Sequence, residues 1–237
     1  MASGVHSKGN GVGMLAFLKK NILGIREVPE GPVERWARAR ELAYARLPEG
    51  GETLGGELLG RNFRMECVPS HRPYIDQFAW VGRFDLNIGP EVEVVLINRE
   101  LKRRFESEID AYRAGHLRLP DGQRQVPEEW LWVDEFPDQG WSGPDDAFWE
   151  RYAVLTDVRE VVGRWVDEAA VAKLMAWPSS VAPERPLMIM LLRGKLYARM
   201  QVSPTDDPDV VLHLLDLMEH LGERALRLMD RPKRSRL

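Results

Sequence analysis

Three residues whose types could support covalent catalysis lie close together in the first third of the sequence. They are a thiol, a base and a carboxylate: Cys67, His71 and Asp76. A nucleophilic thiol needs a base within hydrogen-bond reach, and that base needs an acid to orient it. The alternating pattern around Cys67, however, places it on the same strand face as Phe63 and Met65, where a cysteine packs and is inert. An enzyme of hydrolase or transferase type using this loop is therefore the alternative interpretation, and the pattern favours a structural cysteine.

A second set of residues has the spacing of metal ligands on one face of a helix. His213, Asp216, His220 and Glu223 follow one another at steps of three, four and three residues. Histidine and carboxylate side chains spaced in this way can hold zinc. The same spacing is also that of the polar face of an amphipathic helix, and no HExxH motif is present. The sequence thus predicts no metal, no cofactor and no catalytic residue.

A third candidate combines carboxylates with indoles. The segment 127–150, PEEWLWVDEFPDQGWSGPDDAFWE, contains no lysine or arginine. Tryptophan is enriched at binding hot spots, and its face attracts cations. Two explanations stay open: the indoles fill a seam inside the protein, or they form a surface for a cationic partner. The candidate partner surface consists of Trp130, Trp132, Asp134, Glu135, Asp138 and Trp141.

Composition limits the class of protein. The 237-residue chain has a formal net charge of −4, so its overall field favours neither nucleic acid nor an anionic membrane, and no nucleic-acid partner is expected. Its single cysteine excludes an internal disulfide and favours a reducing, cytoplasmic location. No apolar run reaches the roughly 18 residues of a membrane-spanning helix.

The N-terminal region contains an amphipathic stretch. Residues Met14 to Ile25 are apolar except for Lys19, Lys20 and two other positions, and they follow a Gly/Ser-rich leader. A helix there would dock on the protein itself or on a partner subunit, the usual fate of such segments. Peripheral contact with a membrane is the alternative.

Two stretches carry the pattern of β-hairpins. From Trp80 to Asn98, apolar residues alternate with polar ones, break at Gly89-Pro90 and resume as a continuous apolar run. From Leu187 to Val202, two limbs flank Arg193-Gly194-Lys195, where glycine permits a tight turn. This register predicts that Leu196 and Met200 are buried and that Arg199 is exposed.

Helix signals lie on both sides of these stretches. Apolar spacing predicts a helix over 32–47 and another after Asn98, and one or two strands are expected over 53–69 with a break near Gly60. Asp157 and Asp167 have the form of helix N-caps, and the longest helix should begin at Pro208.

These elements predict an α+β fold in which antiparallel strands in hairpins are covered by helices, with two similar α-β-β-α halves as one option. The expected organisation is a leader and amphipathic helix (1–30), a first half (31–116), a Trp-rich acidic junction (117–150), a second half (151–230) and a basic tail (231–237). The predicted function is that of a non-catalytic cytoplasmic binding or protein-interaction protein, which binds a protein partner or associates with itself.

Overall fold

The computed structural model of this protein describes residues 30–47, 51–119, 125–203 and 205–229. The predicted helix from Met14 to Ile25 and the basic tail 231–237 lie outside these residues. The chain divides into two units, residues 1–31 and 32–237, and the second contains the sheet and the helices.

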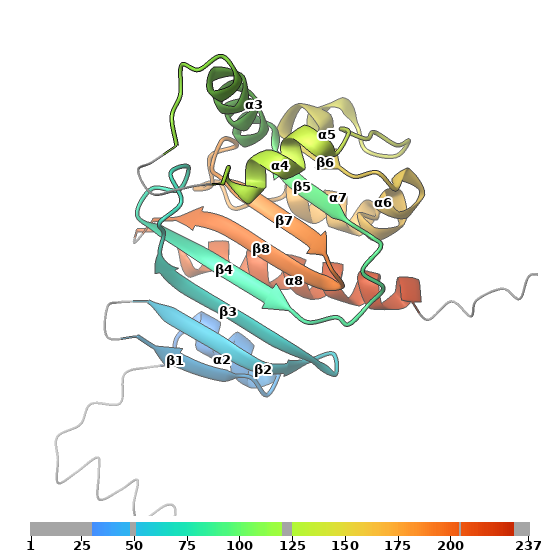
Figure 1. Cartoon of the computed structure of the whole chain (residues 1–237). Helices are drawn as coiled ribbons and strands as arrows, with labels where there is room; N and C mark the ends of the chain where they lie inside the picture. The colour runs from blue at the N-terminus through green and yellow to red at the C-terminus, as the bar shows by residue number, and fades with distance from the viewer. Residues whose placement is uncertain (1–29, 48–50, 120–124, 204, 230–237) are drawn as a thin grey trace, which may run out of the picture. The chain divides into compact units, whose positions relative to one another are not determined.

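One eight-stranded antiparallel sheet organises this unit, with the strand order β1-β2-β3-β4-β8-β7-β5-β6 (Figure 1). The predicted α+β fold with antiparallel strands is confirmed. The strands are β1 (Ala43–Arg46), β2 (Glu52–Leu58), β3 (Arg61–Pro69), β4 (Phe78–Phe84), β5 (Val94–Asn98), β6 (Tyr152–Leu155), β7 (Leu187–Leu192) and β8 (Lys195–Val202).

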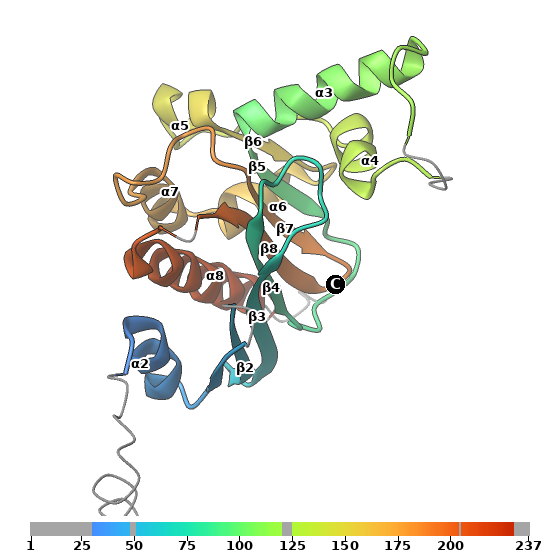
Figure 2. The ribbon, with the colours of Figure 1, turned by 90° about the vertical axis from the view of Figure 1, so that its left-hand side faces the viewer.

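Helices lie on both faces of the sheet, as the turned view shows (Figure 2). Side chains from α2 (Pro32–Ala39), α5 (Asp146–Arg151), α6 (Arg159–Trp165), α7 (Glu168–Met175) and α8 (Pro208–Met229) join the core on the first face. Those from α3 (Arg99–Arg113) and α4 (Glu128–Glu135) join a separate core on the second face. Among the described helices, none is long and apolar enough to cross a membrane.

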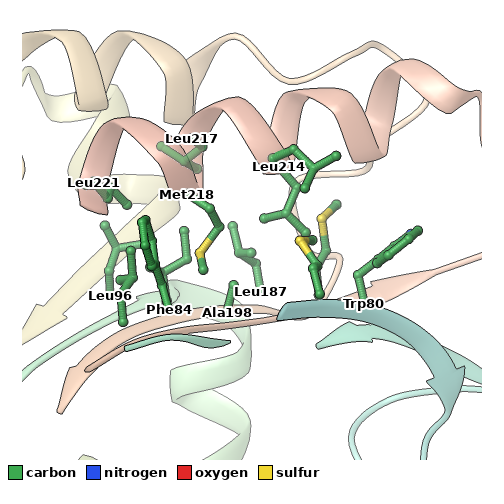
Figure 3. Packing of buried hydrophobic residues seen from close by; sticks show 14 of the residues in the cluster. Trp80, Phe84, Leu96, Leu187, Ala198, Leu214, Leu217, Met218 and Leu221 are labelled. Atoms are coloured by element: carbon green, nitrogen blue, oxygen red, sulfur yellow. The ribbon is translucent and has the colours of Figure 1, made fainter. Parts of the chain in front are cut away.

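The long helix α8 provides the centre of the first core (Figure 3). Its apolar stripe packs on β4, β7 and β8, where Met218 and Leu221 lie over Phe84 and Ala198. A Cβ atom at Gly222 would lie 2.4 Å from Cε1 of Phe84, so the glycine is what allows the helix to approach the sheet this closely. Burial of this continuous apolar layer is the main stabilising contribution to the fold.

The second core covers only part of its sheet face. Its side chains come from α3, α4, the loop before β4, and strands β4 to β8, and within the described residues none comes from β1, β2 or β3. The second face is therefore covered by helices at the β5 to β7 end and not over β1 to β3.

The prediction that Trp80 to Asn98 forms a hairpin is wrong. Both limbs contain a strand, β4 and β5, but β4 pairs with β3 and β8, whereas β5 pairs with β6 and β7. The chain leaves the sheet after Phe84, and Asn87 adopts a φ of 55°. Alternation identifies an extended segment but contains no information about which strand lies beside it.

The hairpin from Leu187 to Val202 is confirmed as β7 and β8, joined by the two residues Arg193 and Gly194. Leu196 and Met200 are buried as predicted. The prediction that Arg199 is exposed is wrong, since its side chain is 16% exposed. Both faces of this strand are covered, so alternation does not separate buried from solvent-facing positions.

Replacing Gly194 by alanine should destabilise the protein by about 2 kcal/mol or more, because the new Cβ adds left-handed strain and a collision. Gly194 has a φ of 73°, and its Cβ would lie 2.3 Å from the Ile88 carbonyl oxygen. Gly115→Ala is the matched control, with the same φ of 73° and no atom within 4 Å, and it should cost only about 1 kcal/mol. Urea denaturation measures both losses, and equal values would contradict the predicted collision.

Several predicted boundaries also change. The helix predicted over 32–47 ends at Ala39, and the chain turns at Glu41 (φ 58°) into β1, because pairing with β2 overrides helical spacing. Asp157 does not cap a helix, since α6 has Val158 at its N-cap, whereas Asp167 caps α7 with Oδ1 3.0 Å from the Ala170 amide. The segment 117–150 contains α4 and α5, and Asp145 caps the latter.

Strands from the two predicted halves share the single sheet, with β4 from the first beside β8 from the second. Residues 32–237 form one compact unit. The duplication of α-β-β-α halves stays a prediction. The two sequence regions are joined by the pairing of β4 with β8.

Candidate functional site

The first sequence candidate, the loop around Cys67, does not form a catalytic arrangement. Cys67 lies in β3 opposite Trp80 and packs at the margin of the first core, while His71 and Asp76 are exposed. Within residues 51–119, no hydrogen bond or ion pair joins these three side chains. Burial, with a smaller contribution from the Glu52 carboxylate, raises the pKa of the Cys67 thiol to about 11. A reactive cysteine requires the opposite shift.

Native Cys67 should therefore react slowly with iodoacetamide at neutral pH, and the rate should rise as the pH approaches the thiol pKa of about 11. Replacing Cys67 with alanine should cost about 1 kcal/mol, the loss of one partly buried side chain. The urea-unfolded protein is the control for intrinsic thiol reactivity. Equal rates of alkylation for native and unfolded protein at pH 7 would contradict the structural role.

The second candidate set, on α8, packs helices together. His213 Nε2 lies 2.8 Å from the Lys173 carbonyl oxygen, and His220 Nε2 lies 2.8 Å from Asp167 Oδ1. Asp216 accepts a hydrogen bond of 2.8 Å from the indole of Trp36. The part of the chain that the structure describes contains no group of three or more possible ligands placed for a metal ion.

The burial of His213 makes stability depend on pH. Burial lowers the pKa of His213, so the folded protein resists protonation of a ring that the unfolded chain protonates readily. The contribution of neutral His213 to the free energy of unfolding is complete above the ordinary histidine pKa of about 6.5 and is lost as the pH falls below it. Between pH 7.5 and 5, the free energy of unfolding should fall less for His213→Gln than for wild type. The exposed control His71→Gln should keep the wild-type slope, and parallel slopes for all three proteins would contradict this account.

The residues of the candidate partner surface lie in different places. Trp130 is 6% exposed and donates to Glu108 at 3.1 Å, while Trp141 packs against the first core and Trp132 against the second. Two of the acids have cationic partners, Asp134 with Arg113 and Asp138 with Arg99, and Glu135 is exposed. The two cores belong to opposite sheet faces, so these six residues do not form one continuous surface, and Trp132 is the indole beside a cavity.

That cavity is a groove between α4 and the second face of the sheet, which we call the α4 groove. Its volume is about 180 Å³. Glu128 and Trp132, four residues apart on α4, contribute one wall. The cross-strand pair Met190 and Tyr197 contributes the floor, and the neighbouring pair Val81 and Arg199 contributes a second wall. The residues that line it are Val81, Gly82, Glu128, Trp132, Met190, Leu192, Arg193, Tyr197, Ala198 and Arg199.

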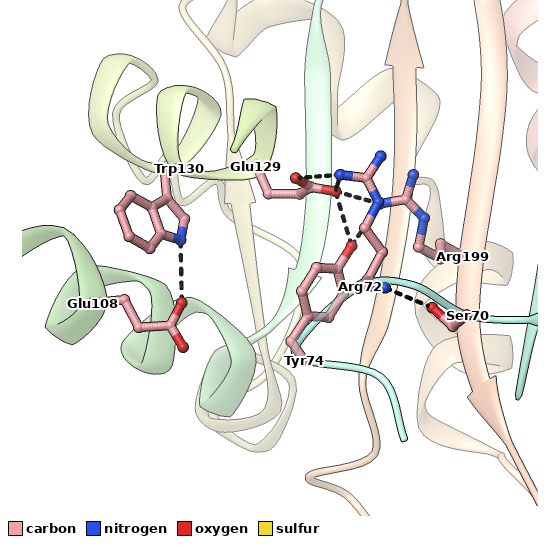
Figure 4. Close-up of polar contacts among 7 residues, drawn as sticks. All are labelled: Ser70, Arg72, Tyr74, Glu108, Glu129, Trp130 and Arg199. Carbon is pink, nitrogen blue, oxygen red and sulfur yellow. Dashed lines mark hydrogen bonds and ion pairs between the residues drawn. The ribbon is translucent and has the colours of Figure 1, made fainter. Parts of the chain in front are cut away.

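A buried carboxylate, that of Glu129, contacts Arg199, which lines this groove (Figure 4). Glu129 is 1% exposed and accepts a hydrogen bond of 3.0 Å from the Tyr74 hydroxyl. Arg72 Nη1 donates to it at 3.1 Å, and Arg199 Nη1 donates both to it and to the Tyr74 oxygen. One carboxylate thus fixes a loop residue, a strand residue and α4 in their mutual positions.

Within this cluster, Arg199 keeps its charge. Burial alone would lower the pKa of Arg199, but the Tyr74 oxygen and the Glu129 carboxylate outweigh it, and the pKa is raised. Burial raises the pKa of Tyr74, which therefore remains a neutral hydrogen-bond donor to the carboxylate. Arg199 is accordingly a permanent cation on the groove wall.

Sequence reasoning missed Glu129 and Arg199, although one signal pointed to the first. In the run EEWLWVDE, Glu129 lies four residues before the buried Val133 and beside the buried Trp130, so it belongs to the apolar stripe of α4. An acid on such a stripe needs a buried partner. The partners, Arg72 and Arg199, are distant in sequence and had no local signal.

Comparisons with known proteins add little to this geometry. No protein-family model and no curated protein matches the sequence. A solved structure, the crystal structure of the mycobacterial trehalose monomycolate transport factor A, TtfA, resembles the chain with a TM-score of 0.44 and 13% sequence identity over 83% of this chain and 93% of that chain. A TM-score below 0.5 supports no conclusion about function.

Proposed function

We propose that this protein is a non-catalytic binding protein whose ligand or partner segment occupies the α4 groove. The observation that carries the proposal is the groove itself, a concave site with an apolar floor and a few convergent polar groups. Ligand sites in proteins have this composition, in which apolar side chains supply contact area and a few polar groups fix orientation.

The chemistry of the groove wall supports binding over catalysis. The residues that line it include no histidine, cysteine, serine or threonine, so the wall lacks the usual pairing of a nucleophile with a base. Its ionisable groups are arginines, a tyrosine and Glu128, which lies 3.5 Å from Arg193. Arginine orients anions but cannot exchange protons near neutral pH.

The candidate partner surface enters this proposal in a narrower form. Trp132 is half-buried beside the groove, where its ring can cover a bound group. Recognition of a cationic partner through the exposed acids of α4 is the second candidate, favoured by Glu135 and Asp134 on the solvent side of the helix. A cytoplasmic location remains part of the proposal, supported by the single free cysteine. A protein partner or self-association also remains part of it.

Fragment screening by methyl NMR tests the proposal. Fragments should shift the methyl signals of Met190, Leu192 and Val81 together, and Trp132→Ala should weaken the hits by about tenfold, the loss expected for a hot-spot indole. Leu131→Ala is the matched control, since Leu131 lies on the same helix, is 41% exposed and does not line the groove. Mass spectrometry should recover the hits chemically unchanged.

Two outcomes would overturn the proposal. Hits that avoid the three methyl groups and collect elsewhere, for example along the second cavity between Pro73 and Gln201, would place binding outside the α4 groove. Conversion of the hits during incubation would contradict the non-catalytic role.

A further inference from the structure

The α4 groove has more guanidinium groups than carboxylates. Two arginines line it, Arg193 and Arg199, against one acid, Glu128. Behind the wall, Arg72 joins Arg199 in sharing the single carboxylate of Glu129. The groove and its supporting cluster therefore carry an excess positive charge, although the chain as a whole is acidic.

The guanidinium of Arg199 has N–H donors that the other residues of the cluster do not use. Its Nη1 serves both Glu129 and Tyr74, whereas Nε and Nη2 have no protein partner among the described residues. A guanidinium offers two parallel N–H groups that match a planar anion. Because the ion pair with Glu129 already holds the guanidinium in place, little side-chain entropy is lost when a second anion binds.

The second arginine lies at the mouth of the groove. Arg193 is a turn residue with a side chain that is 76% exposed, and its contact with Glu128 is 3.5 Å long. An exposed ion pair of this kind is weak and is easily exchanged for a ligand anion. Arg193 and Arg199 thus place positive charge at the rim and on the wall of the same apolar cavity.

The remaining surface of the groove favours a ligand with an apolar body. Met190, Leu192 and Val81 present hydrocarbon, and Trp132 and Tyr197 present aromatic rings. Methionine and aromatic side chains pack well against flat, polarisable groups. We infer that the ligand of the α4 groove is an amphipathic anion, a small molecule with an aromatic or aliphatic body and one negatively charged group that binds Arg199 and Arg193. This inference rests on the proposed function and names the ligand class.

A trio of probes that share one ring system tests the inference. The probes are 2-naphthoate, 2-naphthalenemethanol and 2-naphthylmethylammonium, which share the naphthalene ring and carry an anionic, a neutral and a cationic group, respectively. The intact protein is titrated with each by calorimetry and methyl NMR. Naphthoate should bind at least about tenfold more tightly than the other two, as expected for one charge-assisted contact. Its affinity should fall with added NaCl, whereas that of the alcohol should not.

Two variants identify the contacts. Arg193→Gln should weaken naphthoate about threefold, and Arg199→Lys, which keeps the charge beside Glu129, should weaken it about tenfold by removing the paired N–H donors. Neither variant should change the affinity of the alcohol. Arg103→Gln is the matched control, a 64% exposed arginine on α3 that does not line the groove, and it should bind all three probes as wild type does.

The outcomes separate the two proposals. Equal binding of the trio at Met190, or preference for the ammonium probe, would overturn the anionic ligand class and leave the groove as the binding site. Failure of all three probes to shift the Met190 methyl signal would overturn the inference. The fragment screen then tests independently whether the groove binds any ligand. Naphthoate binding that Arg193→Gln and Arg199→Lys leave unchanged would also overturn it.

Discussion

Replacing Glu129 with alanine should lower the free energy of unfolding by about 3–5 kcal/mol, because removing one partner of a buried ion pair leaves the others uncompensated. The carboxylate is 1% exposed, and its loss leaves the Arg199 and Arg72 guanidinium groups and the Tyr74 hydroxyl without their shared acceptor. Urea denaturation monitored by circular dichroism measures the effect.

The neighbouring acid provides the control for this prediction. Glu128 has a side chain that is 50% exposed and faces Arg193 at 3.5 Å, so Glu128→Ala should change stability by only about 0.5 kcal/mol. Glu129→Gln keeps the shape and an acceptor oxygen and should fall between the two. Similar losses for Glu128→Ala and Glu129→Ala would show that the cluster does not stabilise the fold.

Replacing Trp165 with alanine should lower the free energy of unfolding by about 3–5 kcal/mol, because apolar contacts are lost and a cavity is left behind. Trp165 of α6 is 0% exposed in the first core, and its indole N–H donates to the Leu221 carbonyl oxygen of α8 at 3.1 Å. Thermal and urea denaturation should both show the loss.

Two companion variants separate its causes. Trp165→Phe keeps a six-membered aromatic ring and removes the indole N–H donor. It should therefore cost less than the alanine variant while losing the hydrogen bond to the Leu221 carbonyl oxygen. Trp132→Ala, at the half-buried rim of the α4 groove, should cost only about 1 kcal/mol. A Trp132→Ala loss equal to that of Trp165→Ala would contradict the placement of these two indoles.

Local signals predicted the elements that are decided locally. The β7–β8 hairpin has both alternating limbs and a two-residue turn ending in Gly194, β2 and β3 are separated at Gly60, and α8 begins at Pro208. In each case the period of the apolar residues and the residue type at the break predict the same element. The α+β fold with antiparallel strands followed from these elements.

Partner choice between strands could not be predicted in the same way. The alternation in β4 is equally compatible with β5, β3 or β8 as a neighbour, and the observed pairing depends on which arrangement buries both sheet faces. The site shared this difficulty. The residue type of Trp132 is enough to make it a candidate, whereas alternation predicts an exposed Arg199, because the cover provided by α3 and α4 is visible only in three dimensions.

The central pairing of β4 with β8 also has a consequence for the order of folding. Phe78 pairs with Val202 and Phe84 with Leu196, so the middle of the sheet joins strands that are more than 110 residues apart in the sequence. Such distant contacts carry a large loop-closure entropy and slow folding. During synthesis, the β4 edge must stay unpaired until β8 has been made, and an unpaired edge of this kind is open to misassembly and to chaperones.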